Sequence, residues 1–300
     1  MDLSALGSCV SQVSCVVTQT TSGLISGMLL FLVSCGLTLI FGVLGVVNFA
    51  HGSLYMLGAF FAYTVYVPTH SFALAILAGA VGTGLFGIVF ERFFISRVYG
   101  SDVLMQLLVC YAFVLILDDV VKMVWGASYL SMGMPEAFMV PPLFIAGGVV
   151  PPFYLFLIGI SALFGLALWL LMARTRFGKV VRAAAQNGDM VAALGIRTPY
   201  VFAAVFALGS VMAGAAGALA APVRSLTAGM GFSVLIESFI VTVIGGMGSI
   251  VGALVASILL GLIQSFGAIG FPLFTDGLMF TFMAVVLIVK PTGLFGQRVR

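Results

Sequence analysis

Nine apolar segments, each close to the length of a membrane-spanning helix, follow one another along this 300-residue chain. A helix needs about 20 apolar residues to cross a hydrocarbon core of about 30 Å. Charged residues make up only 7% of the chain, against roughly a quarter in soluble domains, so too little polar surface exists to coat a globule. The sequence therefore predicts an all-α integral membrane protein, a polytopic bundle of about eight or nine transmembrane helices. The segments lie near 22–43, 49–67, 71–90, 103–122, 152–173, 200–221, 229–246, 250–268 and 273–290.

Two of these segments, 49–67 and 229–246, are interrupted by glycine at one end. Non-helical backbone at membrane depth is tolerated only where protein covers it or where it lines a cavity. Each of the two segments is therefore either a full span or a re-entrant segment, and the sequence leaves both readings open.

The basic residues orient the chain, because Lys and Arg concentrate in cytoplasmic loops of membrane proteins. With an odd number of passages, we expect the N-terminus outside and the C-terminus inside. Ten of the twelve basic residues then lie in the cytoplasm, and only Lys122 and Arg224 lie outside. The ten are Arg92, Arg97, Arg174, Arg176, Lys179, Arg182, Arg197, Lys290, Arg298 and Arg300.

The polar segment 174–197 holds five of the twelve basic residues and divides the chain. We expect a single transmembrane domain over 1–300, with a first helix group at 22–173, a cytoplasmic loop at 174–199, a second helix group at 200–290 and a cytoplasmic tail at 291–300. Within the loop, the pattern predicts one helix over 177–194 that Gly188 weakens or bends. Its polar side would carry Arg182, Gln186 and Asp189, and its small apolar positions Val181, Ala184, Ala185, Ala192 and Ala193. A solvated loop and a helix that binds a cytosolic protein both fit these residues.

The residues needed for catalysis are missing from the sequence. A phosphate-binding loop of the G-x-x-x-x-G-K-[ST] kind is excluded, since Gly178-Lys179 is followed by Val180. His51 and His70 lie on different passages, and no Ser/His or paired-carboxylate arrangement recurs. We expect no catalytic and no metal site in this chain.

A few polar residues inside apolar passages are candidates for a translocation pathway or a helix break. Glu237 is costly in the membrane and should face protein, water or a partner such as Arg224. Asn48 is expected to cap a helix that begins at Phe49, with His51 in its first turn bonded to a neighbouring helix. The Gly245, Gly246, Gly248 and Ser249 cluster would let the backbone leave the helix after 229–246.

Small residues recur four apart on three segments, a spacing that brings helix backbones close. Packing within the chain is the favoured reading of these ridges, ahead of a subunit interface. Cys35 and Cys110 are expected as small buried hydrophobes. Cys9 and Cys15 lie on the expected outer side, and the sequence leaves open whether they pair. The ridges are Gly79, Thr83 and Gly87; Gly209, Ala213 and Gly217; and Ser249, Ala253, Ser257 and Gly261.

The segment 36–60, GLTLIFGVLGVVNFAHGSLYMLGAF, resembles the opening motif of the branched-chain amino acid ABC-transporter permeases. These are the integral membrane subunits of bacterial importers that depend on a binding protein. Four further stretches are similar to the family's later landmarks and follow in its order. They are Glu91-Arg92 with Arg97, 182–196, 245–249 and 290–296. The resemblance covers nearly the whole chain.

This resemblance implies a multi-pass permease of the bacterial plasma (inner) membrane, for branched-chain amino acids or related small polar solutes such as urea and short amides. It implies a second permease, identical or homologous, two cytosolic ATPase subunits and an extracytoplasmic substrate-binding protein as partners, and no nucleic acid. ATP and Mg would bind the ATPase subunits, so this chain would hold no cofactor and would not be an enzyme.

The resemblance also gives the polar segment 174–197 a role, as the loop that contacts the ATPase subunits. Ala184 and Gly195 would be its close-packing points, and Arg182 and Asp189 its polar face. The alternative from another class is a secondary transporter or channel, with Glu237 and His51 as an ion site at broken helices. The residues expected in the coupling loop are Arg182, Ala184, Ala185, Asp189, Ala192, Gly195 and Ile196.

Overall fold

The computed structural model describes residues 3–46 and 48–296, and Arg298 and Arg300 lie outside them. Helices dominate, with three short 3-10 turns and one small hairpin. The elements in chain order are α1 (Leu3–Ser11), α2 (Val13–Leu44), α3 (His51–Thr69), α4 (Phe72–Phe93), η1 (Ile95–Arg97), α5 (Val103–Trp125), η2 (Glu136–Phe138), β1 (Leu143–Ile145), β2 (Gly148–Val150), α6 (Pro152–Arg174), α7 (Arg176–Gln186), α8 (Gly188–Ala193), α9 (Thr198–Ala220), α10 (Met230–Gly245), α11 (Ile250–Gly270), η3 (Pro272–Phe274) and α12 (Thr275–Val289).

The predicted polytopic helix bundle is confirmed, because every one of the nine apolar segments forms a helix. Seven helical segments of the described chain are long and apolar enough to cross a membrane: α2, α4 with η1, α5, α6, α9, α11, and η3 with α12. The two segments outside this set are α3 and α10, the same two that glycine interrupts. α10 is too short, with only 16 residues. α3 is less apolar, because it carries polar residues such as His51 at its start.

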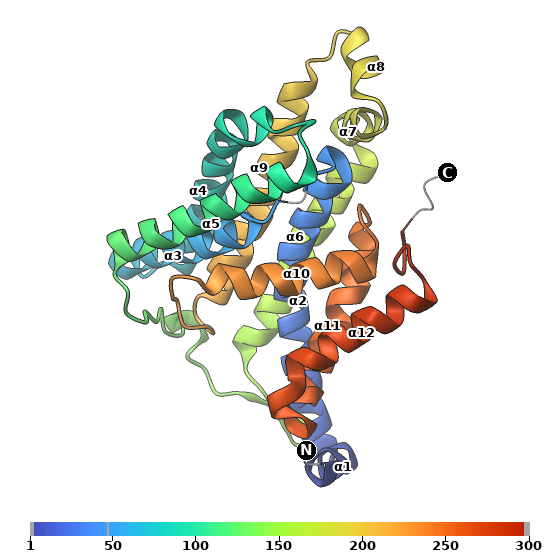
Figure 1. Ribbon diagram of the computed structural model, residues 1–300. Coiled ribbons are helices and arrows are strands. Elements are labelled where there is room, and N and C mark those ends of the chain that lie inside the picture. Colours follow the sequence, from blue (N-terminus) through green and yellow to red (C-terminus); the bar gives the residue numbers. More distant parts are fainter. Residues whose placement is uncertain (1–2, 47, 297–300) are drawn as a thin grey trace.

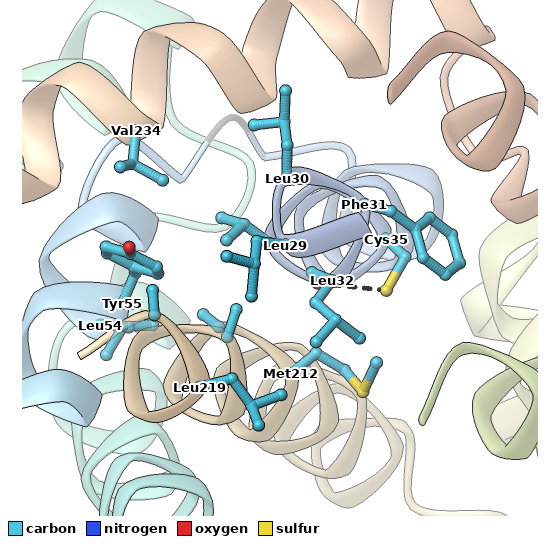
Figure 2. Packing of buried hydrophobic residues seen from close by; sticks show 14 of the residues in the cluster. Leu29, Leu30, Phe31, Leu32, Cys35, Leu54, Tyr55, Met212, Leu219 and Val234 are labelled. Carbon is cyan, nitrogen blue, oxygen red and sulfur yellow. Dashed lines mark hydrogen bonds between the residues drawn. The ribbon is translucent and has the colours of Figure 1, made fainter. Parts of the chain in front are cut away.

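Helix α2 runs through the middle of the bundle along the long axis of the molecule (Figure 1). Every residue from Met28 to Ile40 is buried, so the helix is covered on all sides. It packs against α6, α9, α10 and α11, and Figure 2 shows its side chains between those of α3, α9 and α10. A helix that is apolar all round belongs in the interior of a bundle, and α2 occupies that position.

The small-residue ridges pack within the chain, as predicted. A Cβ atom added at Gly27 of α2 would lie 2.7 Å from the carbonyl oxygen of Ser257 on α11. One added at Gly36 of α2 would lie 2.6 Å from the carbonyl oxygen of Gly209 on α9. On α4, Thr83 donates a hydrogen bond of 3.2 Å to the Ser210 carbonyl of α9. In lipid, hydrophobic burial does not drive helices together, so van der Waals contact between closely approaching backbones supplies the attraction.

α1 and the connection between α5 and α6 lie at one end of the molecule. A disulfide joins Cys9 to Cys15 and ties α1 to the start of α2. The connection at 126–151 contains the β1–β2 hairpin, in which Leu143 pairs with Val150. The hairpin lies against α2, where the Val149 amide donates to the Thr18 hydroxyl at 3.2 Å.

Asp119 and Lys122 form an ion pair at the end of α5, with Asp119 Oδ1 and Lys122 Nζ 2.9 Å apart. Asp118, one helical turn before Lys122, lies toward Gly229 at the start of α10 instead. The exposed pair contributes little to stability, because solvent screens it.

We predict that Gly214→Ala destabilises the bundle, since its Cβ would collide with the Thr83 hydroxyl and the Gly79 carbonyl oxygen. Overpacking of this kind costs about 1–3 kcal/mol or more. The melting temperature of the purified protein in nanodiscs measures the effect. Gly159→Ala on α6 is the matched control, because nothing lies within 4 Å of the added methyl group. Equal melting temperatures for the two variants would contradict the packing argument.

Candidate functional site

The polar segment 174–197 forms two short helices, so the prediction of one helix over 177–194 is wrong. Thr175 begins α7, and its hydroxyl accepts the Gly178 amide at 3.2 Å. Asn187 ends α7 in an extended conformation and begins α8, where its side-chain oxygen accepts the Met190 amide at 2.9 Å. The chain breaks rather than bends because an Asn side chain satisfies the free amide of a new helix. Together α7 and α8 project at the end of the molecule far from α1 (Figure 1).

Helix α7 is fastened to the bundle by its inner face. Gly178 lies against the backbone of Met172 at the end of α6, where no larger residue fits. The Arg182 guanidinium donates to the Met172 carbonyl oxygen. Val181 is fully buried, and Ala184 is 4% exposed. Arg182 therefore caps the end of α6 while it remains exposed. Ala184 faces the bundle, so it is not the partner-facing close-packing point that the sequence suggested.

The outer face of α7 and α8 is open to solvent. Met190 and Leu194, two large apolar side chains, are 63% and 76% exposed on this face. The sequence did not single them out, because the expected helix of 177–194 assigned them no common face. Of the predicted coupling residues, Ala185, Asp189, Ala192 and Gly195 are exposed, and Ile196 packs partly against the core.

A chain of side-chain contacts leads from α8 into the bundle. Gly188 lies next to the Phe202 ring of α9, and Phe202 packs edge-on against Tyr99, with ring centroids 5.8 Å apart. The Tyr99 hydroxyl donates to Glu91 Oε1 at 2.9 Å, and Glu91 is 1% exposed. Burial and the neighbouring carboxylate raise the pKa of Tyr99, so it keeps its proton and stays a donor.

Asn48 and His51 hold the turn between α2 and α3. The helix begins at His51 rather than at Phe49, so the prediction of an Asn48 cap is wrong. Asn48 Oδ1 accepts the Ala50 amide at 3.1 Å and closes the turn before the helix instead. The prediction for His51 is confirmed, since it lies in the first turn of α3 and its Nε2 bonds the Val33 carbonyl of α2 at 3.0 Å.

The glycine cluster at 245–249 forms the turn between α10 and α11. Ser249 begins α11, and its hydroxyl accepts the Gly252 amide at 3.0 Å. Gly246 and Gly248 have φ of 96° and 86°, which only glycine adopts readily. The C-terminal segment docks on this turn, with the Leu294 amide 2.7 Å from the Ile244 carbonyl oxygen. This cluster is therefore a helix break that the end of the chain covers.

Glu237 lies half-buried near the middle of α10. Its carboxylate lies near Arg224, Gln264 of α11 and Asp276 of α12. Glu237 and Arg224 line one small cavity together with Tyr55, but within residues 3–46 and 48–296 they make no direct ion pair. The partner expected from the sequence is thus nearby, with space between the two charges.

Residues 19–289, which include both helix groups and the α7–α8 pair, match the family described as "Branched-chain amino acid transport system / permease component". The chain belongs to this family. The resemblance of the motifs from 36 to 296 is confirmed over nearly the whole chain. The seven apolar spans and this membership make the permease a multi-pass protein of the plasma membrane.

Named relatives align with this permease over almost their full length. The high-affinity branched-chain amino acid transport system permease protein BraD of Pseudomonas aeruginosa is 30% identical over 299 residues, covering 93% of this chain and 95% of BraD. LivH of Escherichia coli K12, with the same description, is 27% identical over 300 residues, with the same shares. The probable branched-chain amino acid transport permease protein LivH of Methanocaldococcus jannaschii is 25% identical over 292 residues, 89% of each chain. No solved structure matches.

We predict that Tyr99→Phe lowers the free energy of unfolding by about 1–3 kcal/mol, because it leaves the buried Glu91 carboxylate without its donor. Thermal unfolding in detergent, followed by tryptophan fluorescence, measures the loss. Tyr129→Phe is the control, since Tyr129 is 82% exposed. An unchanged midpoint in Tyr99→Phe would mean that water or another group satisfies Glu91.

Proposed function

We propose that this permease is the membrane subunit of an ATP-driven importer that takes up branched-chain amino acids or related small polar solutes. The observation that carries the proposal is the match over 19–289, which extends through the exposed α7–α8 pair between the two helix groups. The ATPase activity belongs to separate subunits, and this chain transmits their movement. Its partners are two cytosolic ATPase subunits, a second permease and a substrate-binding protein on the outer side.

The α7–α8 pair is the part that meets the ATPase subunits in this proposal. Met190 and Leu194 are the apolar anchors that enter a cleft on the partner, with Ala185, Ala192 and Gly195 allowing close approach and Asp189 at the polar edge. Exposed large apolar side chains at the centre of a patch are typical contact anchors. Because Gly178, Val181 and Ala184 fasten α7 to the bundle, a push on α8 moves the bundle as well.

The proton- or ion-coupled alternative would use His51 with Glu237. His51 is completely buried, and its Nε2 is committed to the Val33 carbonyl of α2. This enclosure favours a structural role for His51 in the α2–α3 turn over a role in ion transport.

Reconstitution of the permease with its partners tests the importer. We expect uptake of labelled leucine into proteoliposomes only when ATP and the binding protein are both supplied. Uptake driven by a proton gradient without ATPase subunits would refute the proposal and favour a secondary transporter.

Leu194→Asp and Met190→Asp test the coupling surface. Loss of an apolar anchor should cost about 2 kcal/mol of partner binding, and therefore lower uptake by roughly tenfold or more, with the melting temperature unchanged. The readout is ATP-dependent uptake together with retention of the ATPase subunits on the purified permease. Tyr129→Asp, at an exposed site in the α5–α6 connection, is the control. Full retention and full uptake in both variants would move the ATPase contact elsewhere.

A further inference from the structure

An open cavity lies near the end of the bundle opposite α7 and α8. α9 has 23 residues and spans about 34 Å, so Arg224, just after it, is far from the coupling helices. The cavity has a volume of about 150 Å³. Its polar lining comes from Ser22 and Ser26 of α2, Tyr154 of α6 and Arg224, with Ile25, Leu29 and Val223 beside them. A small polar molecule therefore meets hydroxyl groups and one guanidinium here.

A second, much smaller cavity adjoins the first, because the two share Leu29 and Arg224 in their linings. It has room for about 10 Å³ of water, which is close to a single molecule. Figure 2 shows Leu29 and Leu30 of α2, Tyr55 of α3 and Val234 of α10 around this space. Val33 and Glu237 complete its lining. The larger cavity, called the outer cavity below, thus adjoins a constriction among α2, α3 and α10.

Two residues of opposite charge, Arg224 and Glu237, line the constriction. Arg224 lies close enough to Tyr55 and Glu237 to interact with both electrostatically, yet it forms no direct ion pair with Glu237 within the described residues. Charged side chains in a membrane bundle usually pair or mark a substrate pathway, because their burial is costly. A guanidinium and a carboxylate that line one space together with aliphatic side chains match a zwitterion with an apolar side chain.

We propose that Arg224 and Glu237 are the specificity-determining residues of the translocation path, a proposal that rests on the proposed importer function. Arg224 binds the α-carboxylate of the passing amino acid, Glu237 binds its ammonium group, and Leu29, Val33 and Val234 contact its aliphatic side chain. In the present conformation the constriction is closed, and separation of α10 from α2 opens it. The outer cavity holds the amino acid before passage.

The competing explanation is that Arg224 and Glu237 only tie α10 to its neighbours. The two explanations differ in the double variant. Removal of one partner from a buried pair leaves an uncompensated charge, whereas removal of both is often nearly neutral. A structural tie therefore predicts recovery in the double variant, and contact with the substrate predicts none.

The experiment compares Arg224→Gln, Glu237→Gln and the double variant in the complete reconstituted transporter, with leucine and saturating binding protein. We expect each single variant to lower leucine uptake roughly tenfold or more, because a charged hydrogen bond to the substrate is lost. The double variant should be no better than the worse single variant. ATP hydrolysis stimulated by the binding protein should stay within about twofold of wild type, because the coupling surface is unchanged.

Asp119→Asn, at the exposed ion pair of α5, is the control and should transport as wild type does. Recovery of uptake in the double variant, or single variants that keep more than half of wild-type uptake, would overturn the assignment.

If the glutamine variants fail to assemble, Arg224→Lys and Glu237→Asp replace them. Keeping the charge but moving it should raise the KM for leucine, and an unchanged KM would also overturn the assignment. The wild-type arm reports on the importer itself, since ATP-independent uptake there refutes the proposed function and not these residue roles.

Discussion

The burial of α2 on every side is the constraint on which the rest of the bundle depends. Lipid offers no hydrophobic drive for helix association, so close packing has to supply the attraction. Along α2, Gly23, Gly27 and Gly36 let the backbones of α11 and α9 approach almost to contact. Because α2 touches α6, α9, α10 and α11, its position sets the position of all four. The α3–α4–α9 cluster around Gly58, Gly79 and Gly214 repeats the same principle.

Glycine-rich breaks meet at the end of the bundle where α2 and α10 finish. Gly42 of α2 lies against Gly248 of the α10–α11 turn, and the C-terminal segment covers that turn through Leu294 and Phe295. The α7 helix also packs against α2. A force applied at α7 and α8 therefore reaches the central helix directly, and through it the α10 helix that carries Glu237. This continuity links the proposed coupling surface to the proposed constriction.

The few charged residues serve different physical purposes, which their surroundings decide. Arg182 satisfies a carbonyl at the end of α6, Glu91 accepts from Tyr99, and Lys122 pairs with Asp119 in solvent. Arg224 and Glu237 differ from these in that both face one cavity, and within residues 3–46 and 48–296 they form no direct ion pair with each other. Charges that face a narrow cavity are costly to keep in a bundle this apolar, which supports the role proposed for these two residues.

The helical class, the nine segments and the family follow from the sequence, because apolar length and motif order are local properties of the chain. The two segments that glycine interrupts were also recognisable, and they are α3 and α10. The split at Asn187 is a local cap that the sequence reading missed. Only the tertiary structure decided that Ala184 faces inward and that Met190 and Leu194 face outward. It also decided that Tyr55 joins Arg224 and Glu237 at one cavity. These outcomes depend on which helices lie side by side, and contacts between residues far apart in the chain leave no periodic signal in it.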